Sequence, residues 1–124
     1  MNLIPFRFAL ITKITNIPVF IYHMPEETPE AILLLHSMSG VKLTSELPGY
    51  KRGKLQVVVR SATYVSGYAI SKRVIDFFKT VTQQTHNGVY IHFIEATSDP
   101  IAFPRSKGGF IEFSLNFTTA YTEN

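Results

Sequence analysis

The sequence contains no cysteine. This absence excludes disulfides, thiolate metal sites and cysteine nucleophiles together, and it suits a protein made in a reducing cytoplasm. Charged residues are also few, at 17% of the 124 residues against 45% hydrophobic residues. That balance is typical of a globular chain and lacks the charge excess that marks disorder. The length predicts a single domain, residues 1–124, with one core.

Long hydrophobic runs are missing as well. No stretch approaches the about 20 uninterrupted apolar residues that a membrane-spanning helix needs. Residues 1–10 are apolar, but Arg7 interrupts them and no small-residue cleavage site follows, so we expect neither a targeting signal nor a membrane partner. An N-terminal helix is expected instead, since Pro5 is tolerated in a first turn. Its apolar residues recur at helical spacing: Leu3, Phe6, Leu10 and Ile14.

Motifs that carry catalysis or bind metals and cofactors are not found. The histidines lack metal-ligand spacing, and three glycines of the central region are too far apart for a phosphate-binding loop. His36 and His92 fall within or at the end of expected strands, where a hydrogen-bonded structural histidine is the better interpretation. We therefore predict a non-enzymatic protein without a catalytic site, metal or cofactor.

One enzymatic alternative stays open. Ser98, Asp99 and His92 are residue types of a hydrolytic triad, but no nucleophile elbow surrounds them, and Ser-Asp-Pro is ordinary turn chemistry. A small enzyme would need a pocket that gathers His92, Asp99 and a third polar group.

The remaining pattern alternates between strand and helix signals. Residues 31–36 and 89–96 are expected to be strands that are apolar on both faces, and Thr63 is the expected N-cap of the second helix. The expected elements are helix 3–14, strands 19–23, 31–36 and 54–61, helix 64–81, and strands 89–96 and 110–121. This order, α-β-β-β-α-β-β, predicts an α+β fold with a mostly antiparallel β-sheet and two helices packed on one face.

The last strand has the clearest alternation. Its two expected faces are Ile111, Phe113, Leu115, Phe117, Thr119 and Tyr121 on one side and Glu112, Ser114, Asn116 and Thr118 on the other. Such a pattern is typical of a strand with one face on a core. An edge strand for pairing between subunits and an internal strand are equally compatible with it.

Basic residues cluster in and after a long connection at residues 37–52. They are Lys42, Lys51, Arg52, Lys54 and Arg60, and a second basic turn holds Arg105 and Lys107. Long loops inside compact domains are often functional. A solvated hairpin tip is the simpler interpretation, and non-specific phosphate contact is the alternative. Aromatic residues interleave poorly with these charges along the chain, so no stacking platform for single strands is expected.

Several stretches together resemble small tail-terminator and minor-capsid (tail completion) proteins of long-tailed bacteriophages. They are Leu47-Pro48-Gly49-Tyr50 leading into residues 55–61, a helix with Tyr64, Tyr68 and Ala69, the turns His23-Met24-Pro25 and Ser98-Asp99-Pro100-Ile101, strand residues 31–35, Gly108-Gly109, and residues 113–117. These matches span most of the chain in order.

The resemblance implies a virion protein that forms a hexameric ring at the head-proximal end of the tail, assembled in the host cytoplasm. Such a ring ends tail-tube polymerisation and joins tail to head. Its partners would be copies of itself, the tail tube protein, a head-completion protein and, non-specifically, the passing DNA. A head-completion or connector role in the phage neck, and a small basic nucleic-acid-binding module, remain as alternatives.

With this resemblance, function would lie in interfaces rather than in a pocket. A ring of one subunit type needs two different complementary faces on each subunit. We predict that the loop at residues 37–53 and the turn at residues 104–109 make ring or axial contacts. The candidate residues are Lys42, Tyr50, Lys51, Arg52, Lys54, Arg60, Arg105 and Lys107.

Overall fold

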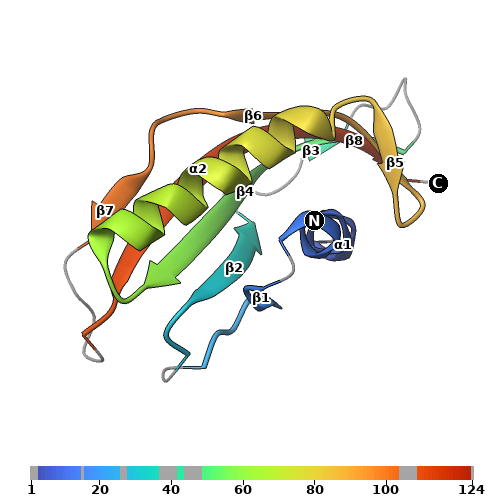
Figure 1. Cartoon of the computed structure of the whole chain (residues 1–124). Coiled ribbons are helices and arrows are strands. Elements are labelled where there is room, and N and C mark those ends of the chain that lie inside the picture. Colours follow the sequence, from blue (N-terminus) through green and yellow to red (C-terminus); the bar gives the residue numbers. More distant parts are fainter. Residues whose placement is uncertain are drawn as a thin grey trace.

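A computed structural model describes residues 3–14, 16–25, 28–36, 42–43, 49–103 and 109–123. Figure 1 shows one curved sheet with α2 lying along it and α1 near β1 and β5. The helices are α1 (Ile4–Lys13) and α2 (Tyr64–Thr80). The strands are β1 (Val19–Ile21), β2 (Ala31–His36), β3 (Lys42–Leu43), β4 (Tyr50–Ser61), β5 (Gln84–His86), β6 (Val89–Ala96), β7 (Ile101–Phe103) and β8 (Ile111–Glu123).

The sheet has the order β1-β2-β4-β8-β6-β5, with β3 added to β4 and β7 added to β8. The β1–β2 pair is parallel, and the other described pairs are antiparallel. The expected α+β fold is therefore confirmed, including the order of its longer elements. Three short strands, β3, β5 and β7, come in addition to those expected from the sequence. No helix among the described residues is long and apolar enough to span a membrane.

Both helices form for local reasons that the sequence contains. In α1, Pro5 lies in the first turn, where its missing N–H has no partner to lose. The residues expected at helical spacing, Leu3, Phe6, Leu10 and Ile14, are all buried. In α2, the Thr63 hydroxyl accepts a hydrogen bond from the Ser66 amide at 3.2 Å, as expected for an N-cap. Ile70, Val74 and Phe78 then bury one side of the helix against the sheet.

The core lies between the helices and one face of β4 and β8. Phe117 meets the Phe78 ring edge-on with centroids 5.1 Å apart, and Tyr121 meets Phe6 in the same way at 5.9 Å. Phe113 and Leu115 are also at most 1% exposed. The alternation of the last strand is thus confirmed, and it places both helices on the same face of the sheet.

Strand β8 is internal, so its interpretation as an edge for pairing between subunits is wrong. It pairs with β4 on one side and with β6 and β7 on the other. Its pairing with β4 runs from Tyr50 opposite Thr122 to Ser61 opposite Ile111. This long register also corrects the loop boundary, because Lys51, Arg52 and Gly53 belong to β4 and not to the connection before it.

Strands β2 and β6 are not equally apolar on both faces as expected. In β2, Ile32 and Leu34 are fully buried, while Leu33 and Leu35 are half-buried. In β6, the core side consists of Val89, Ile91 and Ile94, whose spacing breaks the period of two. A β-bulge explains the break, as described below.

Candidate interaction surfaces

The sheet has an outer face, which we define as the face opposite the helices. On β4 it carries Arg52, Lys54 and Gln56, which alternate with the buried Leu55 and Val57. The neighbouring positions of β8 and β6 on this face are Asn116, Thr118, Tyr90, Phe93 and Glu95. The outer face is therefore polar and aromatic, in contrast to the helix-covered face.

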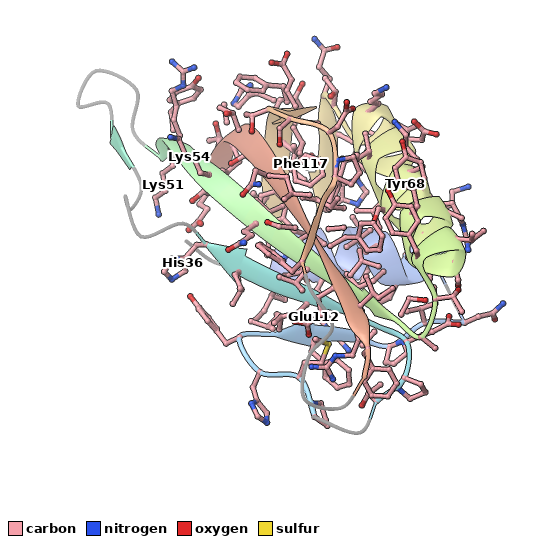
Figure 2. The ribbon with its side chains drawn as sticks, turned by 90° about the vertical axis from the view of Figure 1, so that its left-hand side faces the viewer. His36, Lys51, Lys54, Tyr68, Glu112 and Phe117 are labelled. Carbon is pink, nitrogen blue, oxygen red and sulfur yellow. The ribbon has the colours of Figure 1, made fainter. Side chains whose placement is uncertain are left out.

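Four of the candidate residues lie together at the start of β4, a region that we call the basic end. Tyr50 and Lys51 are half-buried there, and Arg52 and Lys54 are exposed. Lys42 of β3 stands opposite Arg52 in the strand register, so its backbone belongs to the same region. Figure 2 shows Lys51 and Lys54 at one end of β4, away from Tyr68 of α2. The structure thus brings Tyr50, Arg52 and Lys54 together on the outer face, whereas Lys51, which stands opposite Tyr121, points to the other face of the sheet.

Not every charge of the basic end is free. The Lys51 ammonium lies 3.2 Å from the Glu123 carboxylate, and both side chains are about two-thirds buried, at 31% and 28% exposed. Glu95 adds a negative charge on the outer face, because it stands opposite Thr118, which in turn stands opposite Lys54. Arg52 and Lys54 are therefore the cations most available to an anionic partner.

Aromatic side chains from β6 lie beside these cations, which corrects the expectation that aromatic and basic residues interleave poorly. The His92 ring lies 5.2 Å from the Tyr50 ring and 4.8 Å from the Tyr90 ring. The Arg52 guanidinium lies 6.0 Å from the centroid of the Phe93 ring. Sequence reasoning missed these residues because they are 40 positions or so from the basic cluster and meet it only across β8.

A β-bulge in β6 produces this arrangement. Ile91 stands opposite Tyr121 and Phe93 opposite Ala120, so one extra residue, His92, is inserted between them. Tyr90, His92 and Phe93 consequently lie on the outer face, while Ile91 and Ile94 both remain in the core. The spacing of those two isoleucines, three instead of two, is the signal in the sequence that indicates the bulge.

His92 is a hydrogen-bonded structural histidine, as expected. Its Nε2 lies 2.7 Å from the Thr122 hydroxyl. This contact ties the bulge to the end of β8 and fixes the imidazole between Tyr50 and Tyr90.

Arg60 does not join the basic end, although it was predicted with it. It lies at the opposite end of β4 and is 8% exposed. Its Nη2 and Nε each lie 3.1 Å from the Glu112 carboxylate, and its Nη1 donates a hydrogen bond to the Pro25 carbonyl at 2.6 Å. The Phe110 ring lies 5.9 Å from the guanidinium. This residue therefore ties β4, β8 and the segment before β2 together.

The remaining candidates belong to the second basic turn. Arg105 and Lys107 lie outside the described residues, as does the connection at residues 37–48 except for β3.

The residues of the enzymatic alternative are not gathered. A groove of about 580 Å³ between α2 and the end of β6 is lined by Lys72, Ile75, Lys79 and residues 94–99. Ser98 and Asp99 lie in it, but His92 does not, since it is held at the basic end by Thr122. Within the described part of the chain, no group of three or more His, Asp or Glu side chains is placed to hold a metal ion.

Exposed apolar side chains of α1, α2 and β7 form three separate groups. The α1 stripe consists of Ile4, Phe8 and Ile11, which are 54%, 46% and 36% exposed. Tyr64, Val65 and Tyr68 at the start of α2 form a second group, the α2 patch, on the helix-covered side of the sheet. Ile101 and Phe103 form a third group, the β7 patch, on the outer face, because they stand opposite Ser114 and Glu112 of β8. Exposed apolar groups of this kind are typical of surfaces that bind other proteins.

These features define a protein whose candidate binding groups, basic and apolar, are exposed on its surfaces, while its core positions the elements that carry them. Residues 8–123 match the family model described as bacteriophage tail terminator protein. The chain belongs to this family, and it is a structural protein of a phage tail. The resemblance inferred from the sequence is thereby confirmed.

The fold also occurs in a solved phage-like particle. A chain in the structure titled "Virion of native gene transfer agent (GTA) particle" is similar over 92% of this chain and 85% of that one, with a TM-score of 0.67 and 13% sequence identity. At this identity the likeness shows the shared fold. A search of curated proteins gave no match.

Proposed function

We propose that this protein forms a closed ring, a homohexamer, at the head-proximal end of a phage tail. The ring ends polymerisation of the tail tube and joins the tail to the head, so its neighbours are the tail tube protein and a head-completion protein. Assembly takes place in the host cytoplasm. The observation that carries this proposal is the tail terminator match, which covers 116 residues (8–123) and nearly the whole described fold.

The surfaces of the domain fit such a ring. A ring of identical subunits uses heterologous contacts, in which one patch of each subunit binds a different patch of the next. The chain has unlike apolar groups on different elements, namely the α1 stripe, the α2 patch and the β7 patch. The basic end is separate from the α1 stripe and the β7 patch. It therefore stays available for an axial contact, with Lys42, Tyr50, Lys51, Arg52 and Lys54 as its residues and with Arg105 and Lys107 as further candidates.

The first test is the assembly state. The native mass of the purified protein is measured across a concentration series, alone and with tail tubes, and large species are imaged by negative-stain electron microscopy. We expect closed rings of uniform size, in solution or on tube ends, and tubes that no longer elongate once capped. A monomer at every concentration that leaves tube growth unchanged contradicts the proposal. Rings that bind isolated heads but not tubes would instead support the head-completion role.

A second candidate function is nucleic-acid binding by the basic end. The observation that favours it is the gathering of Arg52 and Lys54 with the Tyr90 and Phe93 rings on one face, since cations and aromatic faces together bind single strands. In the ring this surface would contact the passing DNA. In an isolated module it would be the function itself.

The second candidate is tested with matched charge variants. Arg52→Ala/Lys54→Ala removes two cations from the basic end, and Arg73→Ala/Lys79→Ala removes two exposed cations from α2. Binding of single- and double-stranded DNA is measured by fluorescence anisotropy over a range of salt concentrations. We expect the first variant alone to lower the salt slope by about 2, roughly one for each phosphate contact. Equal losses in both variants, or none, contradict a specific role for the basic end.

A further inference from the structure

The edge of the sheet at β7 is open. β7 pairs with β8 on one side, and no strand in the described part of the chain pairs with its other side. All three residues of the strand, Ile101, Ala102 and Phe103, are exposed. Figure 1 shows β7 at one end of the molecule, beside the beginning of α2. An exposed apolar edge strand is a site at which another strand can add to a sheet.

Two backbone hydrogen bonds fix the directions in which the peptide groups of β8 point. The Glu123 amide of β8 donates to the Gly49 carbonyl, next to β4, at 2.9 Å. On the other side of β8, the Thr97 amide donates to the Asn116 carbonyl, also at 2.9 Å. These directions alternate from residue to residue along an antiparallel strand. The odd-numbered residues of β8 therefore bond toward β4, and the even-numbered residues bond toward β6 and β7.

The same alternation identifies the open backbone groups of β7. Ser114 and Glu112 are even-numbered residues of β8 and stand opposite Ile101 and Phe103. Those two residues of β7 therefore direct their N–H and C=O groups toward β8. Ala102, which lies between them, directs both of its groups outward, where no described residue bonds to them. The open edge thus offers one donor and one acceptor to an incoming strand.

Two exposed apolar groups border this edge, one on each face of the sheet. The β7 patch lies on the outer face. On the helix-covered side, Ala102 stands opposite Phe113. The Phe113 ring lies 5.3 Å from the Tyr64 ring and 6.4 Å from the Tyr68 ring of the α2 patch. A strand that pairs with β7 would therefore meet apolar side chains on both of its faces.

The α2 patch faces the β6 and β7 side of the sheet. Tyr64, Tyr68 and Lys72 recur every four residues and so lie on one ridge of α2. Lys72 lines the groove beside residues 94–99, which directs the ridge toward that side. Its ammonium lies 5.7 Å from the Tyr68 ring centroid and covers part of that ring. Tyr64 and Val65, at 54% and 80% exposed, are therefore the most accessible members of the α2 patch.

The strands at the two ends of the sheet do not match the β7 edge. At β1, Arg7 donates from Nε to the Val19 carbonyl at 2.9 Å, and the His23 amide donates to the Ile21 carbonyl at 2.8 Å. The outward carbonyls of β1 are therefore occupied. At the other end, β5 (Gln84–His86) has only polar side chains. Among these described edge strands, the one that matches β7 in length and in apolar faces is β7 itself.

We propose that β7 pairs with β7 of a second copy of this chain, antiparallel and about a two-fold axis. Ala102 of each copy then stands opposite Ala102 of the other, and each N–H donates to the other carbonyl. The axis is perpendicular to the sheet, so like faces stay on the same side. Ile101 of one copy packs beside Phe103 of the other on the outer face, and the two α2 patches approach each other on the helix-covered side. Burial of these apolar groups drives the contact.

This pairing goes beyond the proposed ring. A two-fold contact uses the same patch on both copies, so it closes on two subunits and does not itself build a larger ring. It joins two free subunits, or one subunit from each of two rings. In both cases, loss of the contact halves the native mass.

The absence of native cysteine allows the pairing to be trapped by a disulfide. Opposed residues of a hydrogen-bonded antiparallel pair have Cα atoms about 5.5 Å apart, which is within the range that a disulfide spans. Ala102→Cys is oxidised and separated on a non-reducing gel, and we expect a covalent dimer from this single variant. Thr85→Cys, at an exposed position of β5, is the matched control and should remain monomeric on the gel. A link that forms only when the two variants are mixed would show that another surface covers β7, and it would overturn the pairing.

Two further substitutions test the contact without a disulfide. Ala102→Pro removes the outward N–H but no bond to β8, and proline is tolerated on an edge strand where its N–H side faces solvent. Its control, Ala102→Ser, keeps the N–H. Phe103→Lys places a charge on the apolar edge, which opposes strand pairing, and Tyr22→Lys is its control because Tyr22 is 55% exposed and lies in none of the apolar groups. We expect Ala102→Pro and Phe103→Lys each to halve the native mass in analytical ultracentrifugation, with the circular dichroism of the parent, and the controls to leave it unchanged.

The outcomes separate this pairing from the ring function. No covalent dimer from Ala102→Cys, or a native mass that either test substitution leaves unchanged, overturns the pairing. Tail tubes that the parent and Phe103→Lys cap equally well leave the ring function standing whatever the dimer measurements show. Tubes that the parent does not cap overturn the ring function, while a trapped Ala102→Cys dimer still supports the pairing.

Discussion

The two faces of strands β4 and β8 differ in what they bury. Toward the helices, Phe113, Leu115 and Phe117 are at most 1% exposed, and the two phenylalanines meet aromatic rings of α2. On the outer face, Arg52 and Lys54 are exposed. The same two strands therefore serve stability with the side chains of one face, and at the start of β4 they leave cations of the other face available for partners.

This division has a simple physical origin. Successive side chains of a strand point to opposite faces, so one alternating sequence specifies both surfaces at once. Substitutions on the helix-covered face should lower the free energy of unfolding, and those of exposed outer-face residues such as Arg52 and Lys54 should change binding with little effect on folding. The predictions below test that division, beginning with the largest expected effect.

Phe117→Ala should cause the largest loss of stability. The ring is 1% exposed and packs edge-on against Phe78, so its removal leaves a cavity under α2. We expect the free energy of unfolding to fall by about 3–5 kcal/mol, measured by urea denaturation. Thr118→Ala, one residue on and on the outer face, is the control and should stay within about 0.5 kcal/mol of the parent. Similar losses in both variants would contradict the division between the faces.

Gly67→Ala should be destabilising, although alanine is ordinarily the better helix former. A Cβ at this position would lie 2.4 Å from Cε1 of Phe113 and 3.1 Å from Cβ of Ser61. Helix α2 approaches the sheet this closely only because residue 67 has no side chain. We expect a loss of about 1–3 kcal/mol from overpacking, against the gain of about 0.5–1 kcal/mol usual for this exchange.

A second substitution distinguishes overpacking from other causes at Gly67. Phe113→Leu removes the ring atoms that the new methyl group would meet. In the double variant the cost of Gly67→Ala should therefore be smaller than in the parent background, as read from a double-mutant cycle. An unchanged cost would place the strain elsewhere.

Arg60 and Lys51 each make an ion pair of similar N···O distance, 3.1 and 3.2 Å. The two pairs should nevertheless contribute differently to the free energy of unfolding. Arg60 is 8% exposed and also donates to the Pro25 carbonyl, so Arg60→Met leaves two part-buried acceptors, Glu112 and the Pro25 carbonyl, without this donor. We expect it to cost about 1.5–3 kcal/mol. Lys51→Met breaks a more solvated pair and should cost at most about 1 kcal/mol. Urea unfolding of both variants at low and high salt measures the difference, and an equal cost would refute it.

The sequence predicts the parts of the fold that depend on local pattern. Helical spacing in α1, the Thr63 cap and the alternation of β8 are all readable within a dozen residues, and the structure confirms each. The boundary of β4 was misplaced because Lys51 and Arg52 have no strand pattern of their own. They adopt the extended conformation because they pair with β8, whose register with β4 continues as far as Thr122.

The candidate surface was only half predictable for the same reason. The cations of the basic end are close in sequence, but Tyr90 and Phe93 reach them through the register of β6 on β8 and the bulge at His92. Two strand pairings must be known before the aromatic rings and the cations meet. Arg60 shows the converse, since it is near the cluster in sequence yet lies at the other end of β4, paired with Glu112.

Tyr121 provides an effect that is seen only at high pH, and it tests how far the helix-covered face excludes water. Burial, with a lesser contribution from the charge of Glu123, raises the pKa of Tyr121 from 10.0 to about 12. The unfolded chain then loses this proton at a lower pH than the folded protein does, so stability present below pH 10 is lost as the pH rises toward 12. The slope is about 1.4 kcal/mol per pH unit for one proton.

Tyr121→Phe isolates that contribution. Within the described part of the chain the Tyr121 hydroxyl is buried and has no hydrogen-bond partner, so its removal should leave the stability at pH 7 unchanged or higher. Between pH 10 and 12 the variant should lose less stability than the parent in urea unfolding, because one fewer buried phenol resists ionisation. If the two proteins lose stability in parallel, the hydroxyl is solvated in the folded state. The helix-covered face would then be less dry at its Glu123 end than at Phe117, and the contrast between the two faces would hold only for the middle of β8.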